Sequence, residues 1–478
     1  MRANVLDHSR PHHRHFEEMT RIPHGSYHEQ AYSDYLVSFA EKHGLRCKQD
    51  EMGNVIIYKN GSKGYEDHPA VMLQGHMDMV WEKNKDCPHN FETDPLELYI
   101  KDGFLWANGT TLGADDGVGV SYMLSVLEST DLPHPPLECV FTVQEEVGLY
   151  GAFNIKKEDI SAHRMIGLDD GGGISTCTTS AGGTDGKLLK KVPRTEAGGQ
   201  GYRLTIGGLK GGHSGECIDK ELGNSIKCCT RVLMAIKDQG AVRICDLDGG
   251  LQDNAIPREC EVSFLTDLPE EQVKATVEKL TAELKKELEQ SDPDLTVRLE
   301  PVSCERTMTA EDSASIIDLL YVFPHGFRHK SLQIEGLTIT SENLAAIHLV
   351  DDVFTLIYSL RAMYDSALDE MEKEIEIIAR LFCCDTTRSP RYPSWEYRED
   401  SFVRRQLQKV FKELTGQELI LEAVHGGLEC GVFSRFHDDM DIVTLGAIGL
   451  DVHTPNEHLD LASFDQTYEL LLALLKEL

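Results

Sequence analysis

The sequence lacks a basic excess, a long apolar run and a secretion signal. Its formal net charge is −33, from 80 acidic and 47 basic side chains. Because nucleic-acid backbones and anionic membranes attract basic surfaces, this charge disfavours both as partners. No apolar run approaches the roughly 20 residues of a membrane-spanning helix, and the residues before Met19 have no apolar core. We therefore expect a cytoplasmic protein.

The sequence also lacks a regular cysteine framework. Its 13 cysteines include the neighbours Cys228–Cys229 and Cys383–Cys384 but no Cys-x-x-Cys spacing. In a chain this long the pattern predicts reduced thiols, and it disfavours a zinc site made of cysteines. There is no internal repeat and no low-complexity linker.

The length of 478 residues exceeds one ordinary core and predicts two domains. Up to about residue 185, short apolar segments such as 54–58, 69–74 and 137–143 alternate with helix-like segments such as 118–129. This alternation is typical of an α/β domain whose central sheet is largely parallel and has helices on both faces.

The pattern changes after about Lys187. Residues 202–206 alternate with period two like a half-exposed strand, and 269–290 predict a charged amphipathic helix. Residues 353–361 resemble a strand and 367–382 a helix. Strands with helices on one face indicate an α+β domain.

The first pattern returns after Pro390, and Ser463–Gln466 predicts a capping box at the start of the last helix. We therefore predict a discontinuous catalytic domain at 1–187 plus 389–478. Residues 188–388 are expected to form an α+β domain inserted in it.

Histidines and carboxylates stand directly after the apolar strands or in glycine-rich turns. Each has an ordinary alternative, since an Asp after a strand commonly caps a helix and a Glu pair is commonly solvated. Together they predict a hydrolytic metal site, because strand ends in an open α/β sheet form the ligand crevice. These residues are His76, Asp115, Glu145, Glu146, Asp169 and His453.

The motifs around these residues resemble a known family. LQGHMDMV, GTTLGADDG, TVQEEVGLYGA, IGLDD, GGHSG and HTPNE, in this order, are similar to the co-catalytic dizinc aminopeptidases, carboxypeptidases and aminoacylases. IPHGS, LQDNAIPRE and HGGLECG resemble the Xaa-His (aminoacyl-histidine) dipeptidase branch, so the resemblance covers nearly the whole chain. The sequence departs from the family at Asp116, where Asn is common, and in HTPNE, where the branch has a Ser and an Asp.

The resemblance implies two divalent metal ions per chain. It implies that His76 and Asp169 bind one ion, that Glu146 and His453 bind the other, and that Asp115 bridges them. The mixed histidine and carboxylate ligands favour zinc, and manganese and cobalt are compatible with them.

The resemblance also implies catalytic roles for two further residues. Asp78 is expected to accept a hydrogen bond from His76 and fix its tautomer. Glu145 is expected to be the general base that takes a proton from the attacking water.

Four residues are expected to contact the substrate. His213 resembles the lid histidine that stabilises the oxyanion, with an ordinary turn residue as the alternative. Arg361 and Asn254 are candidates for holding the substrate's C-terminal carboxylate and backbone, although Arg361 as a surface residue is an equal alternative. Glu429 is a candidate for recognising the substrate's amino end.

The resemblance implies hydrolysis of unblocked dipeptides, including those that end in His, and a lid or dimerisation role for the inserted domain, with both a monomer and a homodimer left open. A tripeptidase, a carboxypeptidase and an N-acyl-amino-acid deacylase of the same family remain alternatives. A non-catalytic metal-binding protein is disfavoured, since Glu145 and all five ligand candidates are present.

Overall fold

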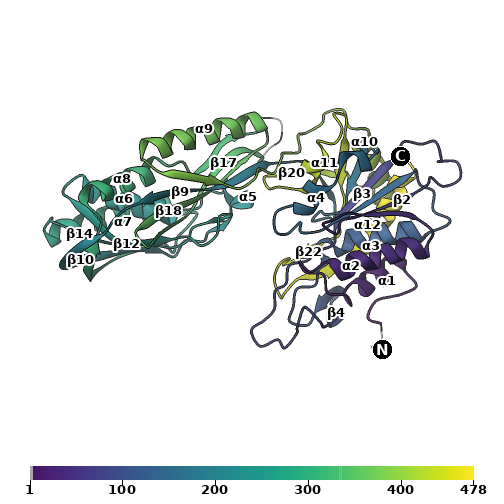
Figure 1. Ribbon diagram of the computed structural model, residues 1–478, viewed down its shortest axis with the longest axis horizontal. Helices are drawn as coiled ribbons and strands as arrows, with labels where there is room; N and C mark the ends of the chain where they lie inside the picture. Colours follow the sequence, from purple (N-terminus) through teal and green to yellow (C-terminus); the bar gives the residue numbers. More distant parts are fainter. Residues whose placement is uncertain (1–3, 333, 335) are drawn as a thin grey trace. The chain divides into compact units, whose positions relative to one another are not determined.

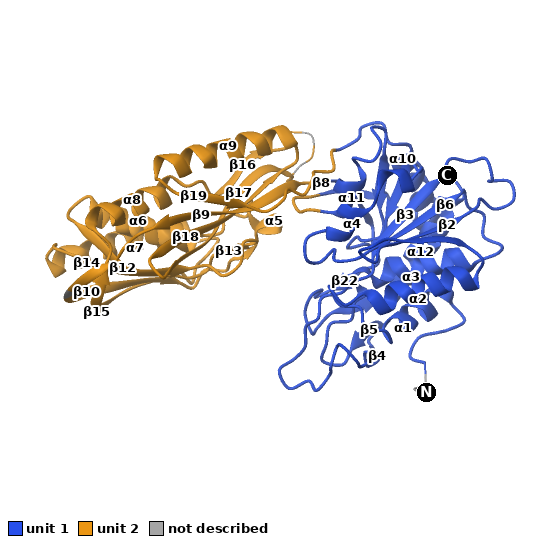
Figure 2. Cartoon of the chain, in the orientation of Figure 1, with its two compact units in different colours: residues 1–179, 397–423, 428–478 blue, residues 180–396, 424–427 orange. Residues whose placement is uncertain are grey.

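The computed structural model describes residues 4–332, 334 and 336–478, and the chain forms two compact units (Figure 2). Unit 1 spans residues 1–179, 397–423 and 428–478, and unit 2 spans 180–396 and 424–427.

The predicted domain boundaries lie inside unit 2. The reason is its sheet: β9 (Gly182–Lys191) runs through the first predicted boundary as one strand, and β19 (Asp385–Arg388) pairs with it. The chain passes between the units near the paired strands β8 (Ser175–Ser180) and β20 (Ile420–Val424).

The central sheet of unit 1 has the order β1-β2-β6-β3-β7-β21 (Figure 1). β3 pairs parallel with β6 and β7, and β7 pairs parallel with β21, whereas β1 and β2 add an antiparallel edge. The strands are β1 (Arg46–Gln49), β2 (Val55–Lys59), β3 (Val71–His76), β6 (Leu137–Thr142), β7 (Arg164–Gly167) and β21 (Asp441–Thr444).

Both faces of this sheet are covered. Every residue of β3 and of β6 is buried, although successive side chains point to opposite faces. This agrees with the continuous apolar runs from which an α/β domain is predicted. The helices of unit 1 are α1 (Pro11–Met19), α2 (Gln30–Lys42), α3 (Ala114–Glu128), α4 (Tyr150–Asn154), the 3₁₀ turn η1 (Lys157–Asp159), α10 (Phe402–Thr415), α11 (Glu429–Phe433) and α12 (Leu461–Leu475).

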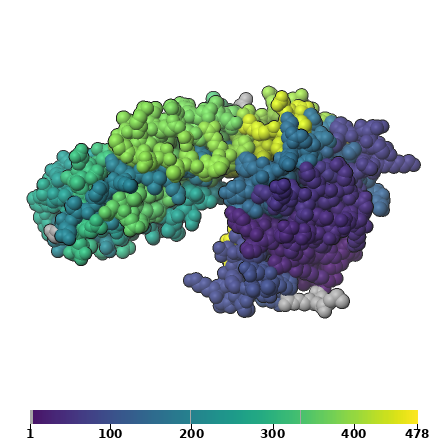
Figure 3. Space-filling model, in the orientation of Figure 1, coloured from purple at the N-terminus to yellow at the C-terminus, as the bar shows by residue number. Residues whose placement is uncertain are grey.

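Two features complete unit 1. A small antiparallel sheet has the order β22-β23-β5-β4, from β4 (Leu98–Lys101), β5 (Phe104–Ala107), β22 (Gly449–Leu450) and β23 (His458–Asp460). The N-terminal segment with α1 and α2, purple in Figure 3, forms part of the surface of this unit.

The predicted capping box of the last helix is wrong. α12 begins at Leu461, two residues before the predicted cap, and Asp460 is the N-cap whose side chain accepts the Ser463 N–H. Asp460, and not Ser463, is the N-cap because the strand β23 leads directly into the helix, so the first turn of α12 forms where the strand ends.

Unit 2 is an antiparallel sheet in the order β15-β10-β14-β12-β17-β18-β9-β19, with β16 beside β17. Its core joins the sheet to α6, α7, α8 and α9, as the α+β pattern predicts. The strands are β10 (Thr195–Gly207), β11 (Gly212–His213), β12 (Val242–Gly249), β13 (Ala255–Ile256), β14 (Cys260–Thr266), β15 (Thr296–Thr307), β16 (Gly326–Lys330), β17 (Thr338–Val350) and β18 (Val353–Ala362). The helices are α5 (Ser214–Cys217), α6 (Ser225–Lys237), α7 (Glu270–Glu287), α8 (Ala310–Val322) and α9 (Asp365–Leu381).

Within the described residues, none of the helices combines the length and the apolar character that crossing a membrane requires.

Candidate metal centre

The functional residues of unit 1 stand where its parallel strands end. His76 is the last residue of β3, Glu145 and Glu146 follow β6, and Asp169 follows β7. Because parallel strands end at the same edge of a sheet, three distant parts of the sequence meet there. Asp115 approaches from the first turn of α3, and the Asp115–Asp116 peptide bond is cis.

Asp115 lies between the two histidines. Its Oδ1 is 2.9 Å from Nε2 of His76, and its Oδ2 is 3.2 Å from Nε2 of His453. The same His453 nitrogen is 2.9 Å from Oε1 of Glu146. Asp115, His76 and Asp169 form one group whose ligand atoms all lie within 4.8 Å of one another, and Asp115, Glu146 and His453 form another.

These donors fit two divalent ions. The two groups share one carboxylate, each contains one imidazole, and paired metal ions in hydrolases lie about 3.5–4 Å apart across such a bridge. Burial raises the pKa of Asp169 well above its usual value, and hydrogen bonds with Asp115 and Glu146 raise that of His453 to about 11. Carboxylates gathered out of water are stabilised by cations, so the site suits bound metal.

The backbone of Asp78 fixes the orientation of His76. Nδ1 of His76 donates to the carbonyl oxygen of Asp78 at 3.0 Å, while the nearer carboxylate oxygen of Asp78 lies 3.5 Å away. A carbonyl can only accept, so Nδ1 carries a proton, and Nε2, on the side of Asp115, is the nitrogen that remains available to a metal ion. That is the tautomer a metal ligand needs.

Glu145 adjoins this site without belonging to either group around Asp115. A ligand atom of Glu145 lies within 4.8 Å of those of His76 and Glu146. Glu145 is half-buried, and this burial raises the pKa of its carboxyl well above the usual value. Both glutamates face the site because the chain leaves the strand after Thr142 and turns.

A carboxylate that the sequence analysis did not assign holds the Asp115 turn. Glu457 is 2% exposed and accepts the backbone N–H groups of Leu112 at 2.7 Å, Gly113 at 3.1 Å and Ala114 at 2.7 Å. Its charge also lies at the N-terminus of α3, where a carboxylate is favoured. The only sequence signal is its place in HTPNE, four residues after His453.

Glu429 also lies beside the centre. It begins α11, is buried, and its Oε2 accepts the Thr142 hydroxyl at 2.7 Å and the side-chain amide of Gln74. Gln74 and Thr142 belong to β3 and β6, whose ends carry His76 and the glutamate pair. Burial raises the pKa of Glu429 to about 7.

The three remaining candidates belong to unit 2. His213 in β11 pairs with Ala255 in β13, and Ser214 N–H donates to the carbonyl of Asn254 at 2.7 Å, so His213 and Asn254 are neighbours. Arg361, at the end of β18, is 7% exposed, which removes the surface alternative. Its Nη1 donates to the Tyr392 hydroxyl at 3.0 Å.

No carboxylate of the described residues lies within salt-bridge distance of the Arg361 guanidinium, although Asp185 interacts with it at longer range, and its Nε is buried there without a hydrogen bond. Ser341, directly opposite Arg361 in β17, shares a hydrogen bond of 2.7 Å with Nε2 of His425. A buried, unpaired cation among hydroxyls is a good receptor for a carboxylate.

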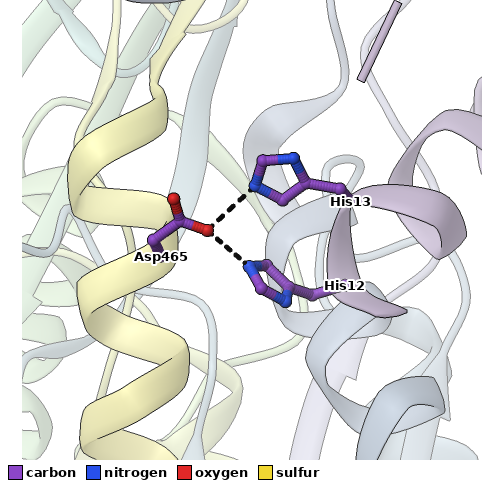
Figure 4. A group of neighbouring side chains, drawn as sticks. All are labelled: His12, His13 and Asp465. Carbon is purple, nitrogen blue, oxygen red and sulfur yellow. Dashed lines mark hydrogen bonds and ion pairs between the residues drawn. The ribbon is translucent and has the colours of Figure 1, made fainter. Parts of the chain in front are cut away.

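A third group of possible ligands lies elsewhere in unit 1. Nε2 of His12 and Nε2 of His13, on α1, lie 2.9 and 3.0 Å from Oδ1 of Asp465 on α12, as Figure 4 shows. Arg10 pairs with the other Asp465 oxygen. Metal bound at Nε2 moves the proton to Nδ1, and in the described structure both buried Nδ1 atoms lack an acceptor. This group is better explained as hydrogen bonds that join two helices.

Three comparisons place the chain among known proteins. Residues 72–477 match the model of peptidase family M20/M25/M40. The chain is 32% identical over 467 residues to the cytosol non-specific dipeptidase of Escherichia coli (strain K12), covering 97% of this chain and 96% of that protein. It superimposes on aminoacylhistidine dipeptidase from Vibrio alginolyticus with a TM-score of 0.89 at 31% identity, over 100% of this chain and 98% of the other.

A tripeptidase from Staphylococcus aureus shares the fold at 17% identity, with a TM-score of 0.55 over 99% of both chains. The family match extends over most of the sequence and includes every residue of the metal centre. The chain therefore belongs to peptidase family M20/M25/M40.

Proposed function

We propose that this protein hydrolyses the peptide bond of unblocked dipeptides, including Xaa-His dipeptides, and that it needs two divalent metal ions. The observation that supports this most is the shared Asp115, whose two oxygens face one histidine each, with Glu145 alongside. The names of the two similar proteins, both dipeptidases, favour this substrate class over the other peptidases of the family.

In this proposal His76 and Asp169 hold one ion, Glu146 and His453 hold the other, and Asp115 bridges. When bound, the ions supply an acidified water and an electrophile for the carbonyl oxygen. Zinc suits the mixed imidazole and carboxylate ligands, and manganese or cobalt suits them as well.

Glu145 is proposed to move the proton. It accepts one from the attacking water, holds it in surroundings that favour the neutral acid, and delivers it to the leaving amine. Asp78 keeps His76 in the tautomer that directs Nε2 to the centre. His213 is proposed to donate to the developing oxyanion.

Each charged end of the substrate is proposed to bind a side chain of opposite charge. Arg361 receives the C-terminal carboxylate, because its side chain is buried and its Nε has no hydrogen-bond partner in the described part of the chain. Asn254 holds the substrate backbone, and Glu429 receives the amino end. An added residue moves the carboxylate by about 3.3–3.6 Å, so longer peptides cannot satisfy Arg361 and the reacting centre together.

A metal-replete hydrolysis screen tests the proposal. It compares a dipeptide panel containing Xaa-His members with tripeptides, acetyl-amino acids and dipeptide amides, before and after chelation. We expect dipeptide cleavage that chelator abolishes and zinc, manganese or cobalt restores. Preference for tripeptides, C-terminal release from long peptides, or deacylation identifies the corresponding alternative, and full turnover without metal contradicts the metal centre.

We further propose that the protein works in the cytoplasm and forms a homodimer through the inserted domain. The cytosolic assignment of the Escherichia coli relative supports the location. Light scattering of the full chain and of a variant with a charged substitution in unit 2 tests the dimer.

A further inference from the structure

The turn that carries Glu145 leaves the sheet, and its backbone N–H groups bond to side chains. β6 ends at Thr142, and each of the next four N–H groups finds a carboxylate or amide oxygen. The four bonds join Val143 N to Asn54 Oδ1 at 3.0 Å, Gln144 N to Glu29 Oε1 at 3.0 Å, Glu145 N to Asp78 Oδ1 at 3.0 Å and Glu146 N to Asp78 Oδ2 at 3.3 Å.

The backbone of this turn is strained at Gln144. Its φ is 53°, in the left-handed region that costs a non-glycine residue about 1 kcal/mol. Such a conformation persists only where the surroundings hold it. Glu29 accepts the N–H of Gln144, the residue immediately before Glu145. The Glu29 carboxylate therefore helps to set the direction in which the Glu145 side chain projects from the backbone.

Glu29 is itself fixed. It is 4% exposed and is the N-cap residue of α2, so its backbone is tied to the helix. Burial raises the pKa of its carboxyl. The neighbouring contacts are fixed as well, since the Ser26 hydroxyl donates to Oδ2 of Asp78 at 2.8 Å and Asn54 donates to Asp50 and to the Gly151 carbonyl.

Three of these residues come from one part of the chain. Ser26, Glu29 and Asn54 all precede residue 72, where the match to the family model begins. The residues before 72 therefore supply two of the four acceptors for the turn that follows β6, on Glu29 and Asn54, and the Ser26 hydroxyl holds Asp78, which supplies the other two.

We propose that Glu29 is a positioning residue for Glu145, and that it acts by holding the N–H of Gln144 so that the base points at the reacting water. This rests on the proposed hydrolysis. Glu29 touches neither metal ligands nor substrate, and its effect passes through the backbone of the turn. A displacement of about 1 Å at a catalytic group can cost about 10²-fold in rate.

The test compares Glu29→Ala, which removes the acceptor, with Glu29→Gln, whose amide oxygen can still accept the N–H. We expect Glu29→Ala to lower kcat for a dipeptide by about tenfold to a hundredfold, with KM within about twofold and metal content unchanged. Glu29→Gln should recover most of kcat. Amide hydrogen exchange over residues 143–146 should become faster in Glu29→Ala and stay slow in Glu29→Gln.

Glu138→Ala is a matched control. Glu138 is 6% exposed and accepts two backbone N–H groups, those of Ser161 and Ala162, but it stands near the start of β6, away from the turn. We expect its loss to lower the unfolding temperature and to leave kcat near that of the unaltered enzyme. A role of Glu29 in stability alone predicts that both variants behave alike.

Other outcomes are equally decisive. Wild-type kcat in a folded, metal-loaded Glu29→Ala overturns the inference, as does an equal loss in Glu29→Gln, which points to charge instead of the acceptor. If Glu29→Ala does not fold, Glu29→Asp repeats the comparison, because its shorter side chain withdraws the oxygen from Gln144. An unaltered enzyme without dipeptidase activity contradicts the proposed function instead, and hydrogen exchange still reports on the turn.

Discussion

Arg361 offers the sharpest test of whether the enzyme recognises the free C-terminal carboxylate of its substrate. Its guanidinium is 7% exposed and has one hydrogen bond from Nη1, to Tyr392, while Nε has no partner within the described structure. A free dipeptide supplies a carboxylate that such a fork binds through two hydrogen bonds. Replacing that carboxylate by an amide leaves a buried cation without its charged partner.

The magnitude follows from this burial. Losing one partner of a buried, hydrogen-bonded charge pair costs about 2–5 kcal/mol, and each 1.4 kcal/mol is about tenfold. We therefore expect kcat/KM for a dipeptide amide to be at least about 30-fold below that of the free dipeptide. Arg361→Ala should lower kcat/KM for the free dipeptide and bring the ratio of the two substrates toward one. Arg361→Lys should give an intermediate ratio, because it keeps the charge and loses the fork.

The assay measures kcat and KM for one dipeptide and its amide, with equal metal loading of each variant. Arg194→Ala is the control, since Nε of Arg194 already bonds to Asp352 at 2.8 Å within unit 2. Its substrate ratio should match that of the unaltered enzyme. Equal cleavage of dipeptide and amide by the unaltered enzyme, or an unchanged ratio in Arg361→Ala, refutes the assignment.

Four further predictions concern unit 1. Glu145→Gln should lower kcat by at least about 10²–10⁴-fold with metal retained, whereas Glu146→Gln should lose metal. Mass spectrometry of bound metal and steady-state rates distinguish the two roles. Metal loss in Glu145→Gln but not in Glu146→Gln means that the two assignments are reversed. Asp169→Asn should weaken metal binding yet raise the unfolding temperature of the metal-free protein, because it removes one buried like charge; a lower temperature in calorimetry contradicts this. Glu457→Ala should cost about 3 kcal/mol or more in urea unfolding, since three charge-assisted hydrogen bonds are lost; a change below about 1 kcal/mol contradicts their importance. Burial lowers the pKa of His12 from 6.5 to about 4, so the folded state resists its protonation. The free energy of unfolding should therefore fall by about 3 kcal/mol from this group as pH falls from 6.5 toward 4. His12→Gln should make the free energy of unfolding less dependent on pH, as measured by unfolding curves at several pH values. An unchanged pH dependence contradicts the assignment.

The residues of the candidate metal centre could be brought together from the sequence because several of them stand at or directly after the ends of buried strands. β3, β6 and β7 are buried throughout or nearly so, and a polar residue at or directly after the end of such a strand lies at the edge of the sheet. His76, Glu145 and Asp169 stand at these places, so the sequence pattern and the topology give the same site. Long periodic segments were predicted equally well, as α7 and α9 illustrate.

Residues that hold backbone N–H groups could not be predicted in this way. Glu29 precedes a helix, where an acidic residue is ordinary, and Glu457 follows an Asn in a polar loop. Glu29 accepts the N–H of Gln144, and Glu457 accepts that of Leu112. Each pair of residues is far apart in the sequence, so these hydrogen bonds can be recognised only in the folded structure. The start of α12 was misplaced for a related reason, because a strand leads directly into it.

Two kinds of carboxylate around the candidate metal centre differ in what faces them. The carboxylates of Asp78, Glu29 and Glu457 accept backbone N–H groups, which offset part of the cost of burying a negative charge. Those of Asp115 and Glu146 face histidines and one another. The first class can therefore keep the turns in place whether or not metal is bound, and the second class is stabilised when cations arrive. If the proposed ligands bind metal, they therefore do so on turns that the backbone hydrogen bonds of Asp78, Glu29 and Glu457 already hold.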